Sequence, residues 1–196
     1  MLPLLYLSFA AVLLFAAFIV FRKIVRRDYL VKGSLTWLSS LLQLLIFAAW
    51  MCIPYLYNPP EWPWFWNLVD TLGSWYVFMD FFLIVLGFVV AFGTMFWFGM
   101  RRAFGIQTQG LVQTGPYRCS RNPQILGDCL LVVGDMLQWP PLYALGWIAL
   151  YGIIGHMMIV TEEEYLKKVC GQAYDRYCEV VPRYVGLGGR TTKTST

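Results

Sequence analysis

Charged residues and histidines are scarce in this sequence, and each shortage excludes a class of protein. Only 13% of the 196 residues are charged, whereas a soluble globular domain carries roughly 25%. The single histidine, His156, excludes a metal site built from several histidines. The five cysteines are an odd number without a CxxC pair, so they indicate neither a zinc site nor a disulfide framework. We therefore expect neither a soluble domain nor a bound metal.

Long apolar runs account for the shortage of charge. Hydrophobic residues make up 59% of the chain, and several runs approach the roughly 20 residues that cross a hydrocarbon core of about 30 Å. We predict a single all-α integral membrane domain over residues 1–187, followed by a flexible tail at 188–196. Its transmembrane helices, about five in number, are expected at residues 2–21, 34–57, 73–99, 124–139 and 142–160.

Prolines set the limits of the fourth predicted helix. Pro123 suits the first position of a helix, where its missing N–H costs nothing, and Pro140-Pro141 cannot continue one. Only a tight turn then separates this helix from the fifth, which makes the two an antiparallel hairpin. The chain at the open ends of the hairpin, near Asn122 and Glu162, is therefore expected to meet at one membrane face.

The positions of the basic residues predict which face this is. All lysines and arginines fall at 22–32, at 101–121 or after Glu162, and five spans place these three regions on one side. The opposite loops, near 58–66 and 140–141, contain none. The positive-inside rule then places the N-terminus outside, and the C-terminus and polar segments in the cytoplasm. The net charge of +4 follows from this bias, so we expect no nucleic-acid partner.

A last helix is predicted after the fifth span, over Glu162–Val181, on the cytoplasmic side. Its apolar residues recur at spacings of three and four, as in an amphipathic helix that lies on a membrane face or packs against the bundle. These residues are Tyr165, Leu166, Val169, Ala173, Tyr177 and Val180. Pro182 is expected to end this helix.

Two polar segments interrupt the apolar background. Gly115–Pro123 carries two arginines and a tyrosine, and Glu162–Leu166 begins with three successive glutamates. Taken alone, the arginines fit anchors at a membrane interface, and the glutamates fit the solvated first turn of a helix. Because both segments lie at the open end of one predicted hairpin, they also suggest one composite site.

The residue order in both segments resembles a known signature. Gly115–Arg118 followed by Arg121–Pro123 is similar to the GPYR…RHP signature of the isoprenylcysteine carboxyl methyltransferase and phospholipid N-methyltransferase superfamily. Glu162–Arg183 resembles that superfamily's EExxLxxxFGxxYxxYxxxVPR ending. The resemblance covers about Gly110–Arg183, and the predicted number of spans agrees with the smaller members.

The resemblance implies a membrane methyltransferase that uses S-adenosylmethionine near the cytoplasmic face. Carboxylates can pair with the ammonium or ribose hydroxyls of this cofactor, and arginine can pair with its carboxylate. The implied cofactor-binding residues are Leu111, Val112, Tyr117, Arg121, Asn122, Pro123, Glu162 and Glu163. Candidate catalytic residues are Glu163, Arg118 and Asp128. Methyl transfer needs mainly alignment and exclusion of water, so no catalytic metal is required.

The sequence departs from the signature at three positions. Asn122 stands where the superfamily usually has histidine, and Ile125 where it usually has tyrosine. Asparagine donates and accepts hydrogen bonds but does not titrate, so this position favours binding over acid–base chemistry. Cys170 replaces the usual phenylalanine, which we interpret as a change in packing.

Polar residues also follow one face of the fourth predicted helix, within an arc of about 80°: Gln124, Asp128, Asp135 and Gln138. Acidic groups inside a membrane are costly and suggest a function. We interpret Gln124, Asp128 and Asp135, together with Asp80 and Arg183, as a candidate path for the substrate. The alternative is hydrogen bonding between helices, which Gly127 and Gly134 would bring close together. A structural pair of Asp128 with His156 is also compatible with the sequence.

The methyl acceptor stays open among several classes. Aspartates along a path suit the amine headgroup of a phospholipid, our preferred acceptor. An isoprenylcysteine carboxylate is an alternative, because its esterification removes charge from a medium of low dielectric constant, and a small thiol is another. Outside methyl transfer, the chain could be an NADPH enzyme like the sterol reductases, which have a related C-terminal ending but more spans, or a non-catalytic membrane scaffold. The oligomeric state cannot be read from the sequence.

Overall fold

The structure, a computed structural model, describes residues 2–57, 75–99, 110–137 and 141–184. This described part consists of helices and connecting segments and contains no strand. The loop predicted at 58–66, residues 138–140 at the predicted tight turn, and the tail predicted at 188–196 lie outside the described residues. The helices in chain order are α1 (Leu2–Ile19), a π-helical turn (Val20–Val25), α2 (Arg26–Lys32), α3 (Trp37–Met51), α4 (Ile53–Tyr57), α5 (Trp75–Phe98), a 3₁₀ turn (Gly115–Arg118), α7 (Pro123–Met136), α8 (Pro141–Cys170) and α9 (Gln172–Val180).

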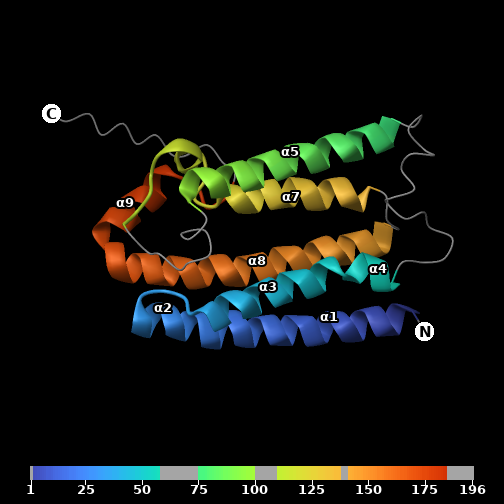
Figure 1. Cartoon of the computed structure of the whole chain (residues 1–196), viewed down its shortest axis with the longest axis horizontal. Coiled ribbons are helices and arrows are strands. Elements are labelled where there is room, and N and C mark those ends of the chain that lie inside the picture. The colour runs from blue at the N-terminus through green and yellow to red at the C-terminus, as the bar shows by residue number, and fades with distance from the viewer. Residues whose placement is uncertain (1, 58–74, 100–109, 138–140, 185–196) are drawn as a thin grey trace.

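The helices run alternately up and down one long axis (Figure 1). Within the described residues, four are long and apolar enough to cross a membrane: Pro3–Lys32, Trp37–Tyr57, Val77–Phe98 and Leu142–Cys170. The helix at the fourth predicted span, α7, has 14 residues and is therefore only about 21 Å long. The predicted class, an all-α integral membrane fold, is confirmed.

The first helix continues beyond residue 21, where the first span was predicted to end. It passes through the π-helical turn to Lys32 and ends at Gly33, whose φ of 73° suits a glycine cap. The side chains of Arg22 and Arg26 bind Glu164 on α8 at 2.7 and 2.6 Å. Glu164 thus pairs with both arginines, and the helix runs on through residues that lie between the first two predicted spans.

A proline and two tryptophans attach the second predicted span to α8. Pro54 has no N–H to offer the carbonyl of Trp50, four residues earlier, and the helix is interrupted at Cys52. The indole of Trp147 donates to that carbonyl at 3.0 Å, and the indole of Trp50 donates to the carbonyl of Trp147 at the same distance. The two rings stack with centroids 4.5 Å apart. These two reciprocal hydrogen bonds and the stacked rings fix the position of α3 on α8.

Small residues bring α5 and α7 into close contact. A Cβ atom added at Gly87 would lie 2.5 Å from the backbone nitrogen of Leu131, and one added at Gly127 would meet the backbone of Ala91. One added at Gly134 would lie 3.0 Å from the backbone oxygen of Asp80. The close approach predicted at Gly127 and Gly134 is therefore present, and its partner is α5.

The prediction of a single helix over Glu162–Val181 is wrong. Helix α8 is unbroken up to Cys170, so the glutamates lie inside a helix and not at its start. The chain then turns at Gly171, with φ of 50° and ψ of −127°, into the separate helix α9. Because this turn changes the helix direction, the predicted apolar stripe does not continue across it. The buried face of α9 is formed by Tyr174 and Tyr177.

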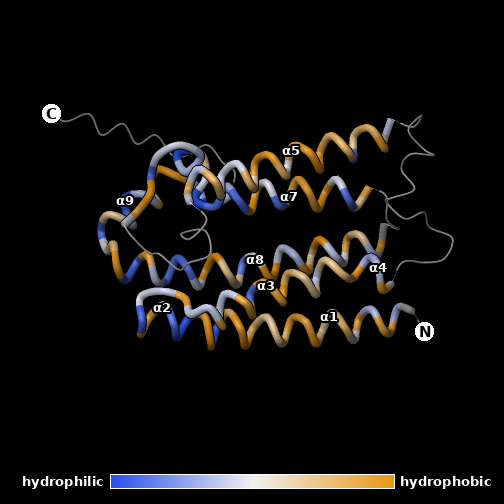
Figure 2. Tube along the Cα trace, in the orientation of Figure 1, coloured by the Kyte–Doolittle hydropathy of each residue, from blue (hydrophilic) through white to orange (hydrophobic). Residues whose placement is uncertain are grey.

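The helices form two layers that leave a polar region at one end. Helices α5 and α7 form one layer, and α1, α3 and α8 form the other (Figure 1). Figure 2 shows that hydrophilic residues gather where α2 and α9 lie, at the opposite end from the start of α1. The candidate site lies at this hydrophilic end, between the layers.

Candidate active site

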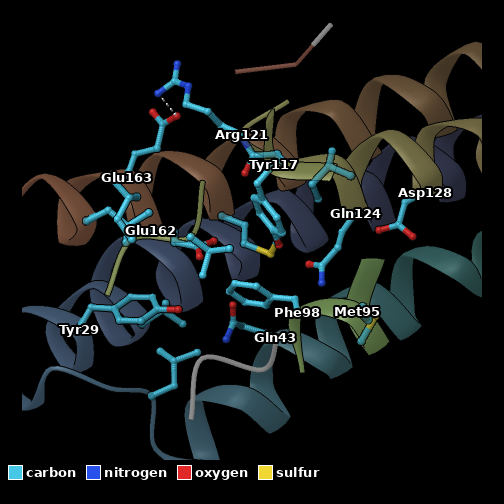
Figure 3. Close-up of a pocket in the computed structure, with 18 of the residues that line it drawn as sticks. Tyr29, Gln43, Met95, Phe98, Tyr117, Arg121, Gln124, Asp128, Glu162 and Glu163 are labelled. Carbon is cyan, nitrogen blue, oxygen red and sulfur yellow. Dashed lines mark ion pairs between the residues drawn. The ribbon is translucent and has the colours of Figure 1, made fainter. Parts of the chain in front are cut away.

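A cavity of about 280 Å³ lies between the two layers at the hydrophilic end (Figure 3). Its wall combines residues of α2, α3, α5, α7, α8, α9 and the segment 110–122, so no single element forms it. The aromatic residues of the wall are Tyr29, Phe47, Phe98, Tyr117, Tyr174 and Tyr177. Those with charged, hydroxyl or amide groups are Ser40, Gln43, Arg121, Asn122, Gln124, Asp128, Glu162 and Glu163. A ligand with both flat and polar parts suits this lining.

The three successive glutamates of α8 have different surroundings, because neighbouring residues point about 100° apart around a helix. Glu164 faces the first helix and binds its two arginines. Glu163 accepts from Arg121 at 2.9 Å and from Arg183 at 2.6 Å. Glu162 lines the cavity and has no hydrogen bond or ion pair within the described residues. Of the three, it is the carboxylate left available to a ligand.

Arg121 is held in the wall by several contacts. Besides Glu163, its Nη1 contacts the hydroxyl of Tyr174 at 3.2 Å and the sulfur of Cys178 at 2.8 Å. Its backbone N–H donates to the carbonyl of Pro182 at 2.9 Å. The Nε atom is buried and has no hydrogen-bond partner in the described structure. Arg121 is thus a fixed cation whose buried Nε donor is still unused.

Asn122 connects the start of α7 to the C-terminal segment. Its side-chain Nδ2 donates to the carbonyl of Arg183 at 3.0 Å, and its backbone N–H donates to the hydroxyl of Ser120 at 3.1 Å. The same side chain lines the cavity. Since asparagine does not titrate, these contacts hold the wall in one geometry across the pH range in which a histidine would change charge.

Two tyrosines connect α9 to the 3₁₀ turn. The hydroxyl of Tyr177 donates to the backbone carbonyl of Tyr117 at 2.7 Å. Burial raises the pKa of Tyr177 to about 12, against the opposing effect of the Arg121 charge. Burial, and then the charge of Glu162, raise the pKa of Tyr117 above its usual range. Both hydroxyls therefore stay neutral, and the rings present uncharged faces to the cavity.

The structure brings most of the residues predicted from the sequence to this cavity. Those that line it are Leu111, Val112, Tyr117, Arg121, Asn122, Gln124, Asp128, Glu162 and Glu163. Pro123 is buried as the first residue of α7, whereas Arg118 is exposed on the 3₁₀ turn. Arg183 contacts the site through Glu163 and does not line the cavity.

The remaining residues of the predicted substrate path lie elsewhere. Asp135 is seven residues beyond Asp128 on α7, about 10 Å further along the axis, and Asp80 is buried on α5 outside the lining. Gln138 lies outside the described residues. The side chain of His156 contacts the hydroxyl of Tyr184 at 2.9 Å, so its partner is not Asp128.

The first half of the chain contributes wall residues that the sequence analysis missed. Tyr29 on α2 and Gln43 on α3 point toward the cavity (Figure 3). Gln43 is the only amide-bearing or charged residue in Trp37–Tyr57. A lone amide side chain in an apolar span was the available signal. Tyr29 carried no comparable signal, because the basic residues around it indicated a loop.

Taken together, the fold and the cavity define a class of protein. Apolar helices long enough to cross a membrane surround a pocket that combines acidic groups, an arginine and aromatic rings at one end of the bundle. Such a pocket suits a small charged ligand bound at the face of a membrane. This is the architecture of a multi-pass membrane protein with a candidate ligand site near one end of its helices.

Comparison with known proteins then gives the family. Residues 69–173 match the model of the phospholipid methyltransferase family, and the chain belongs to this family. The match contains the 3₁₀ turn, α7 and the glutamates of α8, and it ends at Ala173, in the first turn of α9. No match was found among curated proteins or solved structures. Membership supports methyl transfer to membrane substrates, and enzymes of this kind generally use S-adenosylmethionine.

Proposed function

We propose that this chain binds S-adenosylmethionine in the cavity and methylates the amine headgroup of a membrane lipid. The free carboxylate of Glu162, with the rings of Tyr117 and Tyr177 in the same wall, suits a cationic ligand. The unused Nε donor of Arg121 suits a carboxylate. The donor set therefore fits the charged groups of this cofactor, which when bound supplies an electrophilic methyl group on a sulfonium.

Our choice of methyl acceptor rests on the charge of the cavity wall. The described lining residues include three carboxylates, on Asp128, Glu162 and Glu163, and one cation, Arg121, which is bound to Glu163. A wall with this balance attracts cations and repels anions. It favours a protonated amine headgroup as acceptor over the carboxylate of a prenylated cysteine or a thiolate.

An ammonium group must lose a proton before its nitrogen can attack a methyl carbon. We assign the acceptance of this proton to Asp128, which lines the cavity on α7. The buried hydroxyl of Tyr151 lies beside Asp128 and can donate to its carboxylate. The nitrogen lone pair then forms the new N–C bond, and the electrons of the broken S–C bond remain on sulfur.

Cofactor binding separates this proposal from the other classes of function. The purified protein is titrated with S-adenosylmethionine and, separately, with NADPH. We expect saturable binding of S-adenosylmethionine alone. Binding of NADPH alone would support a reductase, and binding of neither would support a scaffold.

Transfer of labelled methyl groups tests the acceptor. The protein is incubated with methyl-labelled S-adenosylmethionine and vesicles that contain phosphatidylethanolamine, or with a prenylated cysteine peptide in the same vesicles. We expect label in the aminolipid. Label in the prenylated peptide and none in the aminolipid would refute the acceptor proposed here.

A further inference from the structure

Two glutamines project into the cavity from opposite layers of the molecule. Gln43 belongs to α3 and Gln124 to the first turn of α7, and Figure 3 shows both side chains directed into the cavity. Neither side chain makes a hydrogen bond within the described structure, and the Nε2 atom of Gln124 is buried. Gln43 also lies outside the residues that match the family model.

A buried amide without a partner costs free energy, and nearly all buried polar groups in native proteins are paired. The other α3 residues that line the cavity are Ser40, Leu44 and Phe47, so Gln43 carries the only amide that this helix contributes. A leucine at Gln43 would remove no hydrogen bond that the structure contains. This cost applies to the buried Nε2 atom of Gln124, whereas Gln43 is half-buried and faces it across the cavity. A ligand that lies between the two side chains would give both amides a partner.

The chemistry of that ligand follows from the groups around the glutamines. Asp128 lies one turn after Gln124 on the same face of α7, and both line the cavity. A carboxylate suits an ammonium group, and uncharged amides suit an oxygen atom. The side chains of Gln124 and Asp128 begin one helical turn apart. They therefore suit a ligand in which two carbons join an oxygen atom to a nitrogen atom.

Building on the proposed function, we propose that Gln43 and Gln124 bind an oxygen atom next to the acceptor amine and so select lipids with a 2-amino-oxygen headgroup. Both an ethanolamine phosphodiester and a long-chain 2-amino alcohol contain this unit. The amides bind the oxygen while Asp128 binds the nitrogen, which fixes the headgroup at two points. An alkylamine without the oxygen is held at one point only.

Specificity constants for three lipids test this assignment. The full chain, Gln43→Leu, Gln124→Leu and the control Gln172→Leu are each assayed with phosphatidylethanolamine, a sphingoid 2-amino alcohol and an alkylamine of equal chain length. Gln172 is exposed on α9 and does not line the cavity. The affinity for S-adenosylmethionine is measured for every protein, which also shows that each variant is folded.

The unsubstituted protein should prefer the two oxygen-bearing lipids. Each cavity variant should lower kcat/KM for at least one of them about tenfold, the loss expected for one hydrogen bond. The rate with the alkylamine should fall much less, so that the preference for the oxygen-bearing lipids is lost, and Gln172→Leu should behave as the unsubstituted protein in every assay. A loss confined to phosphatidylethanolamine identifies the phosphodiester oxygen, and a loss with both lipids identifies the shared 2-oxygen.

Other results would overturn the assignment. Equal losses with all three lipids, or an unchanged preference in Gln43→Leu and Gln124→Leu, would reject the role of the amides while leaving amine methylation in place. If the unsubstituted protein binds the cofactor but methylates no amine, the proposed acceptor fails and this inference fails with it. If Gln124→Leu does not fold, Gln43→Leu alone tests the assignment, because its helix is already rich in leucine.

Discussion

Glu162 and Glu163 are adjacent in the sequence but differ in their surroundings. Glu163 is held by Arg121 and Arg183, whereas Glu162 lines the cavity without a partner in the described residues. An unpaired charge with little access to water destabilises the protein that carries it, and binding sites commonly contain such charges. We infer that Glu163 holds the wall together and that Glu162 is kept free for a ligand.

Replacing Glu162 with glutamine should weaken binding without weakening the fold. The change keeps the shape of the side chain and removes its charge, and no ion pair in the described structure is lost. We expect the affinity for S-adenosylmethionine to fall about 10- to 100-fold, the range for a hydrogen bond to a charged group. The melting temperature should stay equal or rise. Isothermal titration and thermal unfolding in detergent measure the two quantities, and a lowered melting temperature with unchanged affinity would contradict the role given to Glu162.

Replacing Glu163 with alanine should destabilise the protein. The side chains of Glu163 and Arg121 are 14% and 12% exposed, so the change leaves a largely buried arginine without its carboxylate. We expect a loss of about 3 kcal/mol in the free energy of unfolding, the cost of breaking a buried pair from one side. The matched control is Glu179→Ala on the exposed face of α9, which should have little effect. Equal melting temperatures for the two variants would show that the pairs of Glu163 do not stabilise the fold.

At the residue level, the sequence predicted one half of the wall better than the other. The order of residues around Arg121 and Glu163 indicated that they share a site, and the structure places their charged groups 2.9 Å apart. Gln43 was not predicted, because its position opposite α7 depends on how α3 packs against α8. That packing rests on the exchange between Trp50 and Trp147, residues 97 positions apart, which leaves no local pattern in the sequence.

Among the elements, α5 and α7 offer a direct test of packing through glycine. Gly87→Ala would place a methyl group 2.5 Å from the nitrogen of Leu131 and 2.6 Å from the oxygen of Gly127. Because backbone atoms of a neighbouring helix cannot move aside easily, we expect a loss of about 1–3 kcal/mol in stability. Thermal unfolding in detergent measures this loss.

The control for this variant lies on the same helix. A Cβ atom at Gly93 would meet nothing within 4 Å, and alanine is the better helix former by about 1 kcal/mol. Gly93→Ala should therefore leave the stability unchanged or raise it. A similar loss in both variants would mean that helix propensity, and not the contact between α5 and α7, determines the effect.

Helix boundaries depended on contacts that the sequence does not display. The first and fifth spans were predicted to end at residues 21 and 160, yet both helices continue, and Glu164 pairs with Arg22 and Arg26 across them. The break at Gly171 did have a local signal, since glycine adopts the positive φ found there. The regular apolar spacing on either side of Gly171 hid that signal.

At the scale of the whole molecule, the two layers explain how one cavity combines distant parts of the chain. The layer of α5 and α7 contributes Gln124 and Asp128, and the other layer contributes Gln43 and Glu162. Neither layer contains a complete set of polar groups. The helices run alternately along one axis, so the polar ends of several helices meet at the end that holds α2 and α9 (Figures 1 and 2).

This arrangement makes the orientation of the protein in its membrane measurable. Cys119 is exposed beside the 3₁₀ turn, at the cavity end of the molecule, which the positive-inside rule predicts to face the cytoplasm. A variant that keeps Cys119 as its only cysteine should react with a membrane-impermeant maleimide only after the cells are permeabilised. A second variant, with Glu61→Cys as its only cysteine, places the thiol in the predicted outer loop and should react in intact cells. The reverse pattern would put the cavity on the outer face, away from the cytoplasmic supply of S-adenosylmethionine that the proposed reaction needs.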